Sequence, residues 1–507
     1  MIKKIAIIGG GTAGWLAANH LGKALQDQDE VSITLIESPS IPTIGVGEGT
    51  VPSIRKSLQK FGISESDFIS QCDVTFKQSI KFKNWLNKSK HGENYYHHLF
   101  DHPCPFGDDL TTAWLAQHQD IHYADFVSKQ SQACERNYAP KTITTPEFIG
   151  INGYAYHFDA LKFAKFLAAH AKEKFKVGHI QADIKDAELD EQGYITHLIT
   201  QTEQKYAFDF IIDCTGFSSA ILGDKLGVSF ISKAESLLTD SVLTIQVPTE
   251  SNSEIPPYTI ATAHQAGWIW DIALTSRRGV GFVYSSKHMT EQEARRKLAH
   301  YLGVQSNDVT PRHIRFTVGR RERFWEKNCV AIGLSQGFVE PLEATAILIA
   351  DFSADLLSKR FPQNREDIEI LKDQYNHNIA YIWEQTFDFV KMHYSISDRN
   401  DSQFWLDNRD ESTISTKLIS NLKRWKQFPP IREDFESKFD LFDFENYLYV
   451  LYGMKYITRT PHLNIEYKNL TLRQSKLLEL KREKILSELP AHRLLLEKIK
   501  KYGLQKS

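Results

Sequence analysis

The sequence predicts an α/β fold that begins with a βαβ unit and ends in a mainly helical C-terminal part. The βαβ unit is indicated by an apolar run at Ile5 to Ile8, a glycine turn, an Ala/Leu-rich segment and a second apolar run ending in Glu37. Strand-like and helix-like segments then alternate over about residues 150–350. Beyond about residue 360 the periodicity is helical, and Gly453 and Gly503 are the only glycines after Gly337.

The length predicts two parts, because a single core rarely grows beyond about 250–300 residues and this chain has 507. We place a first module at residues 1–390, with an approximate boundary, and a mainly helical region at 391–507 that contributes to a substrate pocket. The alternation of strands and helices in the first module is typical of a parallel sheet covered by helices.

Composition excludes several classes of function. The chain has 61 basic and 63 acidic residues without a long block of one sign, which argues against a nucleic-acid partner. No window approaches the roughly 18 apolar residues of a membrane span. The five cysteines lack CxxC spacing, so the sequence shows no zinc or disulfide pattern and fits a reducing compartment. We therefore expect a cytoplasmic protein that binds a small molecule, with no metal site and no membrane contact.

The glycine turn carries a dinucleotide-binding pattern. Gly9, Gly11 and Gly14 form GxGxxG between a strand and a helix, and Glu37 follows at the distance expected for a ribose contact. Glycines there allow a pyrophosphate to approach the helix N-terminus, where free N–H groups favour an anion. The position at the start of the chain favours FAD over NAD(P), within a Rossmann-like module. Because only one such pattern is present, reduction requires transient hydride donation or a separate reductase.

Two further segments have functional and structural interpretations. "IGVGEGTVPSI" contains Gly47 and Glu48 and is either a loop that covers a flavin or phosphate or a surface turn. "TFKQSIKFKNW", if it is one strand, places Lys77, Lys81 and Lys83 on one face, and the alternative to a functional lysine is a solvated strand face.

Two more segments involve carboxylates and tryptophans. "QGFVEPLEATAI" sets Pro341 before a helix start, flanked by Glu340 and Glu343, and such a start suits a halide, a carboxylate or a flavin carbonyl. The alternative for Glu343 is a carboxylate that complements the helix dipole. "GWIWDIAL" places Trp268 and Trp270 on one face of a strand, where they either fill a core or line a pocket.

Taken together, these segments resemble the flavin-dependent tryptophan halogenase family, in chain order from residue 4 to about residue 405. The resemblance also includes "YAYHFDALKFAKFL", "DFIIDCTGF", "RRGVGFVYSS", "GRRERFWEKNCVAIGL" and "HYSISDRNDSQFW". It implies a module of the GR2 type shared with flavin monooxygenases. It also implies that FADH₂, supplied by a separate flavin reductase, reacts with O₂ and that chloride or bromide is then converted into hypohalous acid.

The resemblance assigns residues to this chemistry. The family's catalytic lysine falls on Lys77 and its catalytic glutamate on Glu343. The halide is expected on the backbone amides of Thr345 and Ala346, where many relatives have other side chains in place of Ala344-Thr345-Ala346. The cofactor contacts implied are Gly9, Gly11, Thr12, Ala13, Gly14, Glu37, Gly47, Glu48, Gly333, Thr345 and Ala346.

The substrate is less well defined by the resemblance. Trp268 and Trp270 match a paired-tryptophan signature between the flavin and substrate pockets, and His98 and Phe100 match residues that sandwich indole. The residues that hold the amino-acid part of tryptophan have no clear match, and Tyr447 is offered in their place. We therefore expect an indole or related aromatic, with a bare indole, a peptide or a carrier-bound aromatic as alternatives to free tryptophan.

Two other functions start from the same residues. A flavin-dependent aromatic hydroxylase shares the reaction of reduced flavin with O₂, but it needs neither Lys77 nor Glu343 beside paired tryptophans. A flavin-binding protein without turnover is the third alternative, and it does not explain why both candidate catalytic residues are present. Halide preference, ring position and oligomeric state, a homodimer included, are left open by the sequence.

Overall fold

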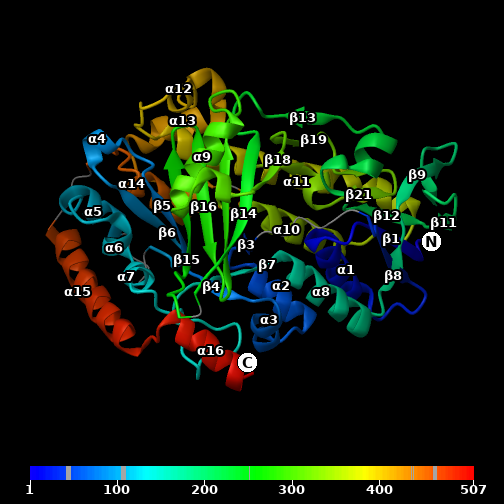
Figure 1. The fold of residues 1–507 in the computed structure, drawn as a ribbon, viewed down its shortest axis with the longest axis horizontal. Coiled ribbons are helices and arrows are strands. Elements are labelled where there is room, and N and C mark those ends of the chain that lie inside the picture. Colours follow the sequence, from blue (N-terminus) through cyan, green and yellow to red (C-terminus); the bar gives the residue numbers. More distant parts are fainter. Residues whose placement is uncertain are drawn as a thin grey trace.

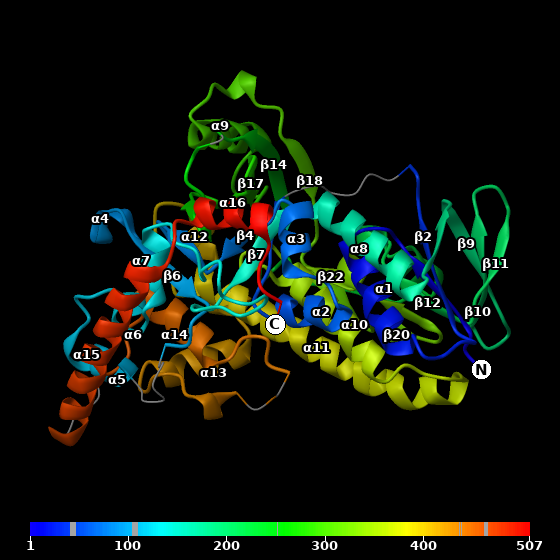
Figure 2. The ribbon, with the colours of Figure 1, turned by 90° about the horizontal axis from the view of Figure 1, so that it is seen from below.

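The computed structural model describes residues 1–40, 47–103, 110–250, 252–435, 437, 439–460 and 465–506. Two large sheets lie side by side along the long axis of the molecule (Figure 1). The N-terminus lies at one end, and helix α15 (Ile465–Glu488) lies at the other in both ribbon views (Figures 1 and 2). The predicted α/β fold with a helical C-terminal region is confirmed.

The first sheet is the predicted βαβ unit with its neighbours. Strands β1 (Lys4–Ile8) and β2 (Ser32–Glu37) are parallel and are joined by α1 (Thr12–Leu25). The sheet order is β20-β21-β12-β1-β2-β8, and only β20 runs antiparallel to its neighbour. The further strands are β20 (Trp325–Glu326), β21 (Cys329–Ala331), β12 (Phe210–Asp213) and β8 (Gly178–Gln181). The helix α1 packs against α8 (Ala160–Phe175) and α10 (Thr345–Lys359).

The second sheet has the order β18-β14-β17-β16-β15-β5-β6 and is mostly antiparallel. Its strands are β18 (Arg312–Arg315), β14 (Ser241–Pro248), β17 (Arg277–Tyr284), β16 (Gly267–Ala273), β15 (Tyr258–His264), β5 (Ser79–Lys83) and β6 (Tyr95–Leu99). The strand predicted for "GWIWDIAL" is confirmed as β16. Every residue of β16 is buried, because both faces of this part of the sheet are covered.

A small sheet connects the two large ones. Its order is β3-β7-β4, with β3 (Gly47–Gly49), β7 (Ala155–Asp159) and β4 (Thr75–Lys77), and β3 lies against β16 and β17. The segment predicted as one lysine-bearing strand is therefore two strands, β4 and β5, in different sheets and separated by Gln78. This break places Lys77 where the two large sheets meet.

Helices α10 and α11 (Arg365–Ser395) lead from the first sheet into the C-terminal part. The proposed boundary at residue 390 falls inside α11, a helix of 31 residues. The later helices are α12 (Gln403–Asp407), α13 (Thr416–Trp425), α14 (Phe444–Gly453), α15 and α16 (His492–Tyr502). Helix α14 packs against β6, the edge strand of the second sheet.

The remaining elements complete the surface around these layers. Besides α1 and α8, the helices of the first 302 residues are α2 (Ile54–Phe61), α3 (Glu65–Gln71), α4 (Lys88–His91), α5 (Leu110–Gln117), α6 (Tyr123–Val127), α7 (Gln130–Glu135) and α9 (Glu291–Leu302). Two small sheets contain β9 (Ile184–Leu189), β10 (Ile195–Thr200), β11 (Lys205–Ala207), β13 (Phe230–Ser232), β19 (Gly319–Arg321) and β22 (Gly337–Phe338). Among the described residues, no helix combines the length and apolar content that crossing a membrane requires.

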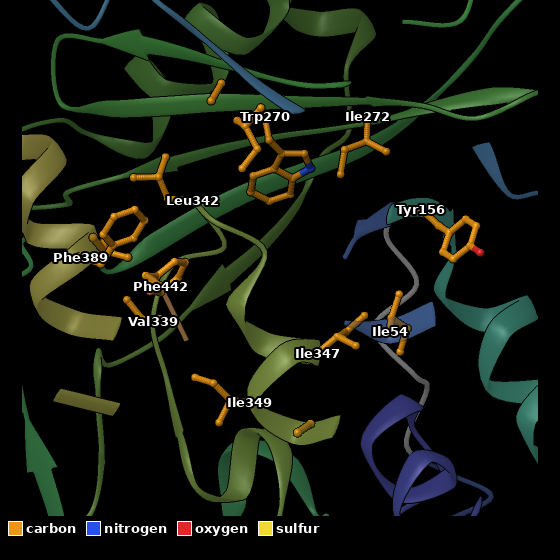
Figure 3. Close-up of a cluster of buried hydrophobic side chains, with 14 of the residues drawn as sticks. Ile54, Tyr156, Trp270, Ile272, Val339, Leu342, Ile347, Ile349, Phe389 and Phe442 are labelled. Carbon is orange, nitrogen blue, oxygen red and sulfur yellow. The ribbon is translucent and has the colours of Figure 1, made fainter. Parts of the chain in front are cut away.

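Trp270 and Ile272 project from the same face of β16 toward the segment that carries Leu342, and Ile347 of α10 lies beside Ile54 of α2 (Figure 3). Gly281, the partner of Trp270 on β17, leaves room for the indole ring. A Cβ atom at Gly281 would lie 2.1 Å from the ring of Trp270.

We predict that Gly281→Ala lowers the free energy of unfolding by about 1–3 kcal/mol, because the new methyl group displaces the Trp270 ring from a filled core. Chemical denaturation of both proteins measures the change. Trp270→Leu added to Gly281→Ala is the control: the two substitutions are expected to be strongly non-additive. An unchanged stability in Gly281→Ala, or strict additivity in the double variant, contradicts this packing.

Candidate active site

The glycine turn after β1 forms a cradle for a dinucleotide. Gly9 has a φ of +118°, and a Cβ atom there would lie 2.2 Å from the carbonyl oxygen of Cys214. At Gly11, by contrast, no atom of the described chain lies within 4 Å of the Cβ position. Gly11 is also the N-cap of α1 and offers no side-chain cap. The backbone therefore presents its free N–H groups to open space, as a pyrophosphate requires.

Other predicted cofactor residues surround this cradle. Glu37 ends β2 beside Gly10, and its Oε1 lies 2.9 Å from Nε2 of His179. Gly333 has a φ of +76°, and its Cβ position lies 2.6 Å from the Cβ of Ala13, so the turn after β21 approaches the start of α1 closely. Glu37, which lies beside Gly10, and the turn at Gly333 therefore both adjoin the cradle at the start of α1. The described residues around it fit an adenine dinucleotide such as FAD.

The predicted flavin loop is described only from Gly47 onward, and Ile44 to Val46 lie outside the described residues. Glu48 lies in β3, and burial raises its pKa to about 7. Next to it, the carbonyl of Thr50 accepts a hydrogen bond of 3.0 Å from Nζ of Lys77. This segment therefore contacts the candidate catalytic lysine directly.

Lys77 is fully buried, which excludes the solvated strand face as its environment. Burial lowers its pKa to about 7, although the charge of Glu343 acts in the opposite direction. Its Nζ lies 5.3 Å from the ring centroid of Phe100. The neighbouring lysines differ: Lys81 is paired with Glu135 at 2.5 Å, and Lys83 is exposed. Lys77 is thus the fully buried member of the predicted set, and its lowered pKa allows it to exchange a proton near neutral pH.

Glu343 is buried and is held by two histidines. His98 Nδ1 lies 2.9 Å from Oε2 and 3.0 Å from Oε1, and His393 Nε2 lies 2.8 Å from Oε1. Burial alone raises the pKa of Glu343, but the charge and hydrogen bonds of His98 and His393 outweigh it and lower the pKa to about 2. Glu343 is therefore an ionised carboxylate in the protein interior.

The second glutamate of the turn, Glu340, is held by Trp268 and Tyr394. Trp268 Nε1 donates to Oε2 of Glu340 at 2.5 Å, and the Tyr394 hydroxyl donates to the same oxygen at 2.7 Å. Burial raises the pKa of Glu340. Trp268 and Trp270 lie side by side with ring centroids 6.1 Å apart. Trp268 thus both fills the core and fixes the turn that carries Glu343.

The start of α10 has the features of an anion site. Ala344, its N-cap, has a φ of +57°, a strained conformation for a residue with a Cβ. The amides of Thr345 and Ala346 open the helix, where the first N–H groups have no intrahelical acceptor. Thr345 Oγ1 is buried and finds no hydrogen-bond partner among the described residues. A cavity of about 10 Å³, room for one water-sized sphere, adjoins both residues.

The predicted substrate residues divide into two groups. His98 and Phe100 lie next to Glu343 and Lys77, respectively. Tyr447 contacts neither histidine directly: its ring lies 4.8 Å from Phe389, which contacts His98, and 5.1 Å from Trp425, between ring centroids. Tyr449, two residues along α14, faces His98 with centroids 6.2 Å apart. The structure therefore brings Tyr449 closer than Tyr447 to the candidate catalytic residues.

An aromatic cavity of about 260 Å³ lies next to β6 and α14. Tyr96 and Tyr449 belong both to its lining and to the surroundings of His98 and Glu343. The Tyr96 hydroxyl is buried without a hydrogen-bond partner among the described residues. The other rings in the lining are Tyr95, Trp114, Tyr123, Tyr452 and Tyr456.

Sequence reasoning missed His393, Tyr394 and Asn446. His393 and Tyr394 are the first two residues of "HYSISDRNDSQFW", a segment that contributes to the resemblance. The resemblance marked this segment but assigned no function to either residue. Asn446 Oδ1 lies 2.9 Å from Nε2 of His98. No local motif in "FENYLYVLYG" marks this residue, because its role depends on the packing of α14 against β6.

Comparisons with known proteins identify the family. The profile of the tryptophan halogenase family matches residues 4–468. The tryptophan 6-halogenase SttH of Streptomyces toxytricini is 35% identical over 453 residues, which are 85% of each chain. The tryptophan 7-halogenase RebH of Lentzea aerocolonigenes is 34% identical over 428 residues, 81% of this chain and 79% of the relative.

Solved structures agree as well. A tryptophan halogenase from Shewanella frigidimarina NCIMB 400 superposes with a TM-score of 0.96 at 37% identity and covers 100% of this chain and 99% of its own. A tryptophan C-6 flavin-dependent halogenase from taromycin biosynthesis, Tar14, has a TM-score of 0.91 at 32% identity over 98% of this chain and 100% of its own. The fold and the site define a flavin-dependent halogenase. The chain belongs to the tryptophan halogenase family.

We predict that Lys77→Met raises the free energy of unfolding at pH 7 by about 1–4 kcal/mol, because an apolar side chain avoids the burial of a charge. The ordinary pKa of lysine is about 10.4, so the penalty is fully present below the folded-state pKa of about 7. It disappears as pH rises toward the unfolded-state value. Denaturation at several pH values measures the gap between the two proteins. A gap that is absent, or that grows from pH 7 to pH 10, contradicts the burial of an ionisable Lys77.

Proposed function

We propose that the protein uses FADH₂ and O₂ to chlorinate or brominate an indole or related aromatic ring, with hypohalous acid delivered by Lys77. The observation that carries this proposal is the burial of an amine and an ionised carboxylate between the dinucleotide cradle and a group of aromatic side chains. A lysine on a solvated strand face and a glutamate that only caps a helix at the surface would not need to be buried together.

The cofactor and the halide would be held by separate parts of the chain. The turn at Gly9 to Gly14, Glu37 and Gly333 would hold the dinucleotide. When bound, the reduced flavin supplies the two electrons with which O₂ is activated to oxidise a halide. The amides of Thr345 and Ala346 would bind the halide at the start of α10, where the dipole favours an anion. This placement needs no particular side chain at Ala344 or Ala346.

Lys77 would carry the oxidised halogen to the substrate. As an ammonium it donates a hydrogen bond to hypohalous acid and makes the halogen more electrophilic. As an amine it exchanges one N–H bond for an N–halogen bond and releases water. The lowered pKa of about 7 supports both forms near neutral pH.

Glu343 would complete aromatic substitution. A carboxylate stabilises the cation that forms when the ring takes up the halogen, and it then accepts the ring proton. Because the two histidines lower its pKa to about 2, Glu343 is ionised at neutral pH. Trp268, bonded to Glu340, would hold this turn and separate the organic substrate from the cofactor.

The substrate would be recognised mainly through its ring. His98, Phe100 and Tyr449 surround Lys77 and Glu343 with aromatic faces. The relatives named above act on tryptophan according to their names, which supports an indole ring here. The neighbouring cavity of about 260 Å³ supports a substrate with an additional group, such as a peptide or a carrier-bound aromatic. A separate flavin reductase would supply the reduced cofactor.

We predict that the protein with FAD, NADH, a flavin reductase, bromide or chloride and an indole gives a halogenated product, detected by its mass. Lys77→Ala and Glu343→Gln should each lower the rate at least about 100-fold, because each removes a group that acts in the reaction. FAD binding, measured by titration, should be unchanged in both variants. Lys81→Ala is the matched control, since Lys81 follows on β5 but pairs with Glu135.

The outcomes separate the alternatives. A hydroxylated product indicates an aromatic monooxygenase, and flavin binding without any product indicates a non-enzymatic protein. Halogenation that persists in Lys77→Ala refutes the assignment of Lys77. A screen of free tryptophan, indole and tryptophan-containing peptides with each halide identifies the substrate.

We also predict a pH dependence that distinguishes the two forms of Lys77. If the ammonium acts, single-turnover rates fall as pH rises through about 7, and if the free amine acts, they rise over the same range. The measurement uses pre-reduced FAD, so that the reductase does not contribute. A profile that is flat from pH 6 to pH 8 contradicts the participation of Lys77 in either form.

A further inference from the structure

We propose that His393 is a positioning residue for Glu343: it occupies one carboxylate oxygen permanently and keeps the carboxylate ionised, so that the other oxygen accepts the ring proton. This inference rests on the proposed halogenation. It adds His393 to the residues involved and assigns a different role to each of the two carboxylate oxygens of Glu343. It follows from the hydrogen bonds at the C-terminal end of α11.

His393 lies between two acceptors. Its Nδ1 lies 2.9 Å from the backbone carbonyl oxygen of Phe389, and its Nε2 lies 2.8 Å from Oε1 of Glu343. A carbonyl oxygen only accepts, so Nδ1 carries a proton. An ionised carboxylate also only accepts, so Nε2 carries a second one. His393 is therefore a cation wherever Glu343 is an anion, and the pair forms a charge-assisted hydrogen bond in the interior.

His98 binds the same carboxylate in a different setting. Its Nδ1 contacts both oxygens, and its Nε2 faces Oδ1 of Asn446 at 2.9 Å. His98 lies on β6, the edge strand of the sheet, and its ring lies next to Tyr449 of α14. Both rings are buried, but His393 is bonded to its own helix, α11, whereas His98 is bonded to Asn446 of α14. In the proposed step the aromatic guest takes the place of His98 beside Oε2, while the bond to its own helix holds His393 at Oε1.

The two histidines therefore have different roles during substitution. With His98 displaced by the guest, Oε2 of Glu343 is free while Oε1 stays bound to His393. The ring C–H bond then breaks, its electron pair returns to the aromatic system, and the proton moves to Oε2. Nothing is oxidised or reduced in this step, and His393 keeps both of its protons.

The expected pH dependence follows from the groups that surround Glu343. His98 from β6 and His393 from α11 form hydrogen bonds with it. The charge of Glu343 raises the pKa of Lys77 on β4 and that of Tyr96 on β6. Burial opposes ionisation, as it does at Glu48, whose pKa is raised to about 7. Removal of His393 therefore raises the pKa of Glu343 toward the neutral range, and the carboxylate becomes protonated as pH falls.

The test compares His393→Gln with the wild type in single turnovers with pre-reduced FAD and an indole, from pH 5.5 to pH 8.5. Glutamine keeps a hydrogen-bond donor but carries no charge. The ratio of the variant to the wild-type single-turnover rate constant removes the pH dependence that the two proteins share. We expect this ratio to be roughly tenfold lower at pH 5.5 than at pH 8.5. We also expect a small change in KM and unchanged FAD affinity.

The matched control is His20→Gln. His20 is fully buried, and its Nε2 lies 2.8 Å from Oδ1 of Asp351, which is the same distance as in the His393–Glu343 pair. It lies on α1, outside the candidate active site. Its variant-to-wild-type ratio should not change with pH, so a pH-dependent loss in His393→Gln but not in His20→Gln separates positioning from a general effect on folding.

The outcomes also separate this proposal from the proposed function. If the wild type halogenates and the ratio for His393→Gln is independent of pH, His393 has no such role, while the halogenase assignment stands. If the wild type gives no halogenated product, the proposed function fails. If His393→Gln does not fold, ¹⁵N NMR of histidine-labelled wild type decides: a buried ring protonated at both nitrogens from pH 6 to pH 8 supports the proposal, and its absence refutes it.

Discussion

The candidate active site depends on keeping an amine and an ionised carboxylate together in the protein interior. Burial disfavours the charged form of each group, and the structure counters this in different ways. Lys77 has a lowered pKa and donates a hydrogen bond to the backbone carbonyl of Thr50, whereas Glu343 is bound by two histidines that lower its pKa. The interior therefore contains Lys77, whose pKa is close to neutral pH, together with Glu343, whose carboxylate is ionised.

The rest of the fold serves to bring these two groups together. Lys77 comes from the small sheet between the two large ones, at a break in the chain between β4 and β5. Glu343 comes from the turn before α10, and consecutive residues of α11, His393 and Tyr394, bind its two glutamates. Trp268 adds a bond from β16 to Glu340. The turn is thus fixed by a helix on one side and by the second sheet on the other.

The sequence predicted the elements whose signals are local. Periodicity and glycine spacing predicted the strand, turn and helix around Gly11. Periodicity also predicted the strand around Trp268. The break at Gln78 was not predicted, because the alternation of side chains continues across it. His393, Asn446 and Tyr449 were not predicted either: their roles arise from contacts between α11, α14 and β6, which no spacing within one segment reveals.

The central claim is tested most directly by the titration of Lys77 itself. ¹³C NMR of the protein labelled at lysine Cε, with the signal assigned by its loss in Lys77→Met, gives the pKa of this one amine. We expect a midpoint of about 7. Burial also lowers the pKa of Lys391 to about 7, so the loss of the signal in Lys77→Met, and not its midpoint, identifies Lys77. A midpoint near the ordinary lysine value of about 10.4 would show that Lys77 is solvated, and it would contradict an interior transfer of halogen between the cofactor and the substrate.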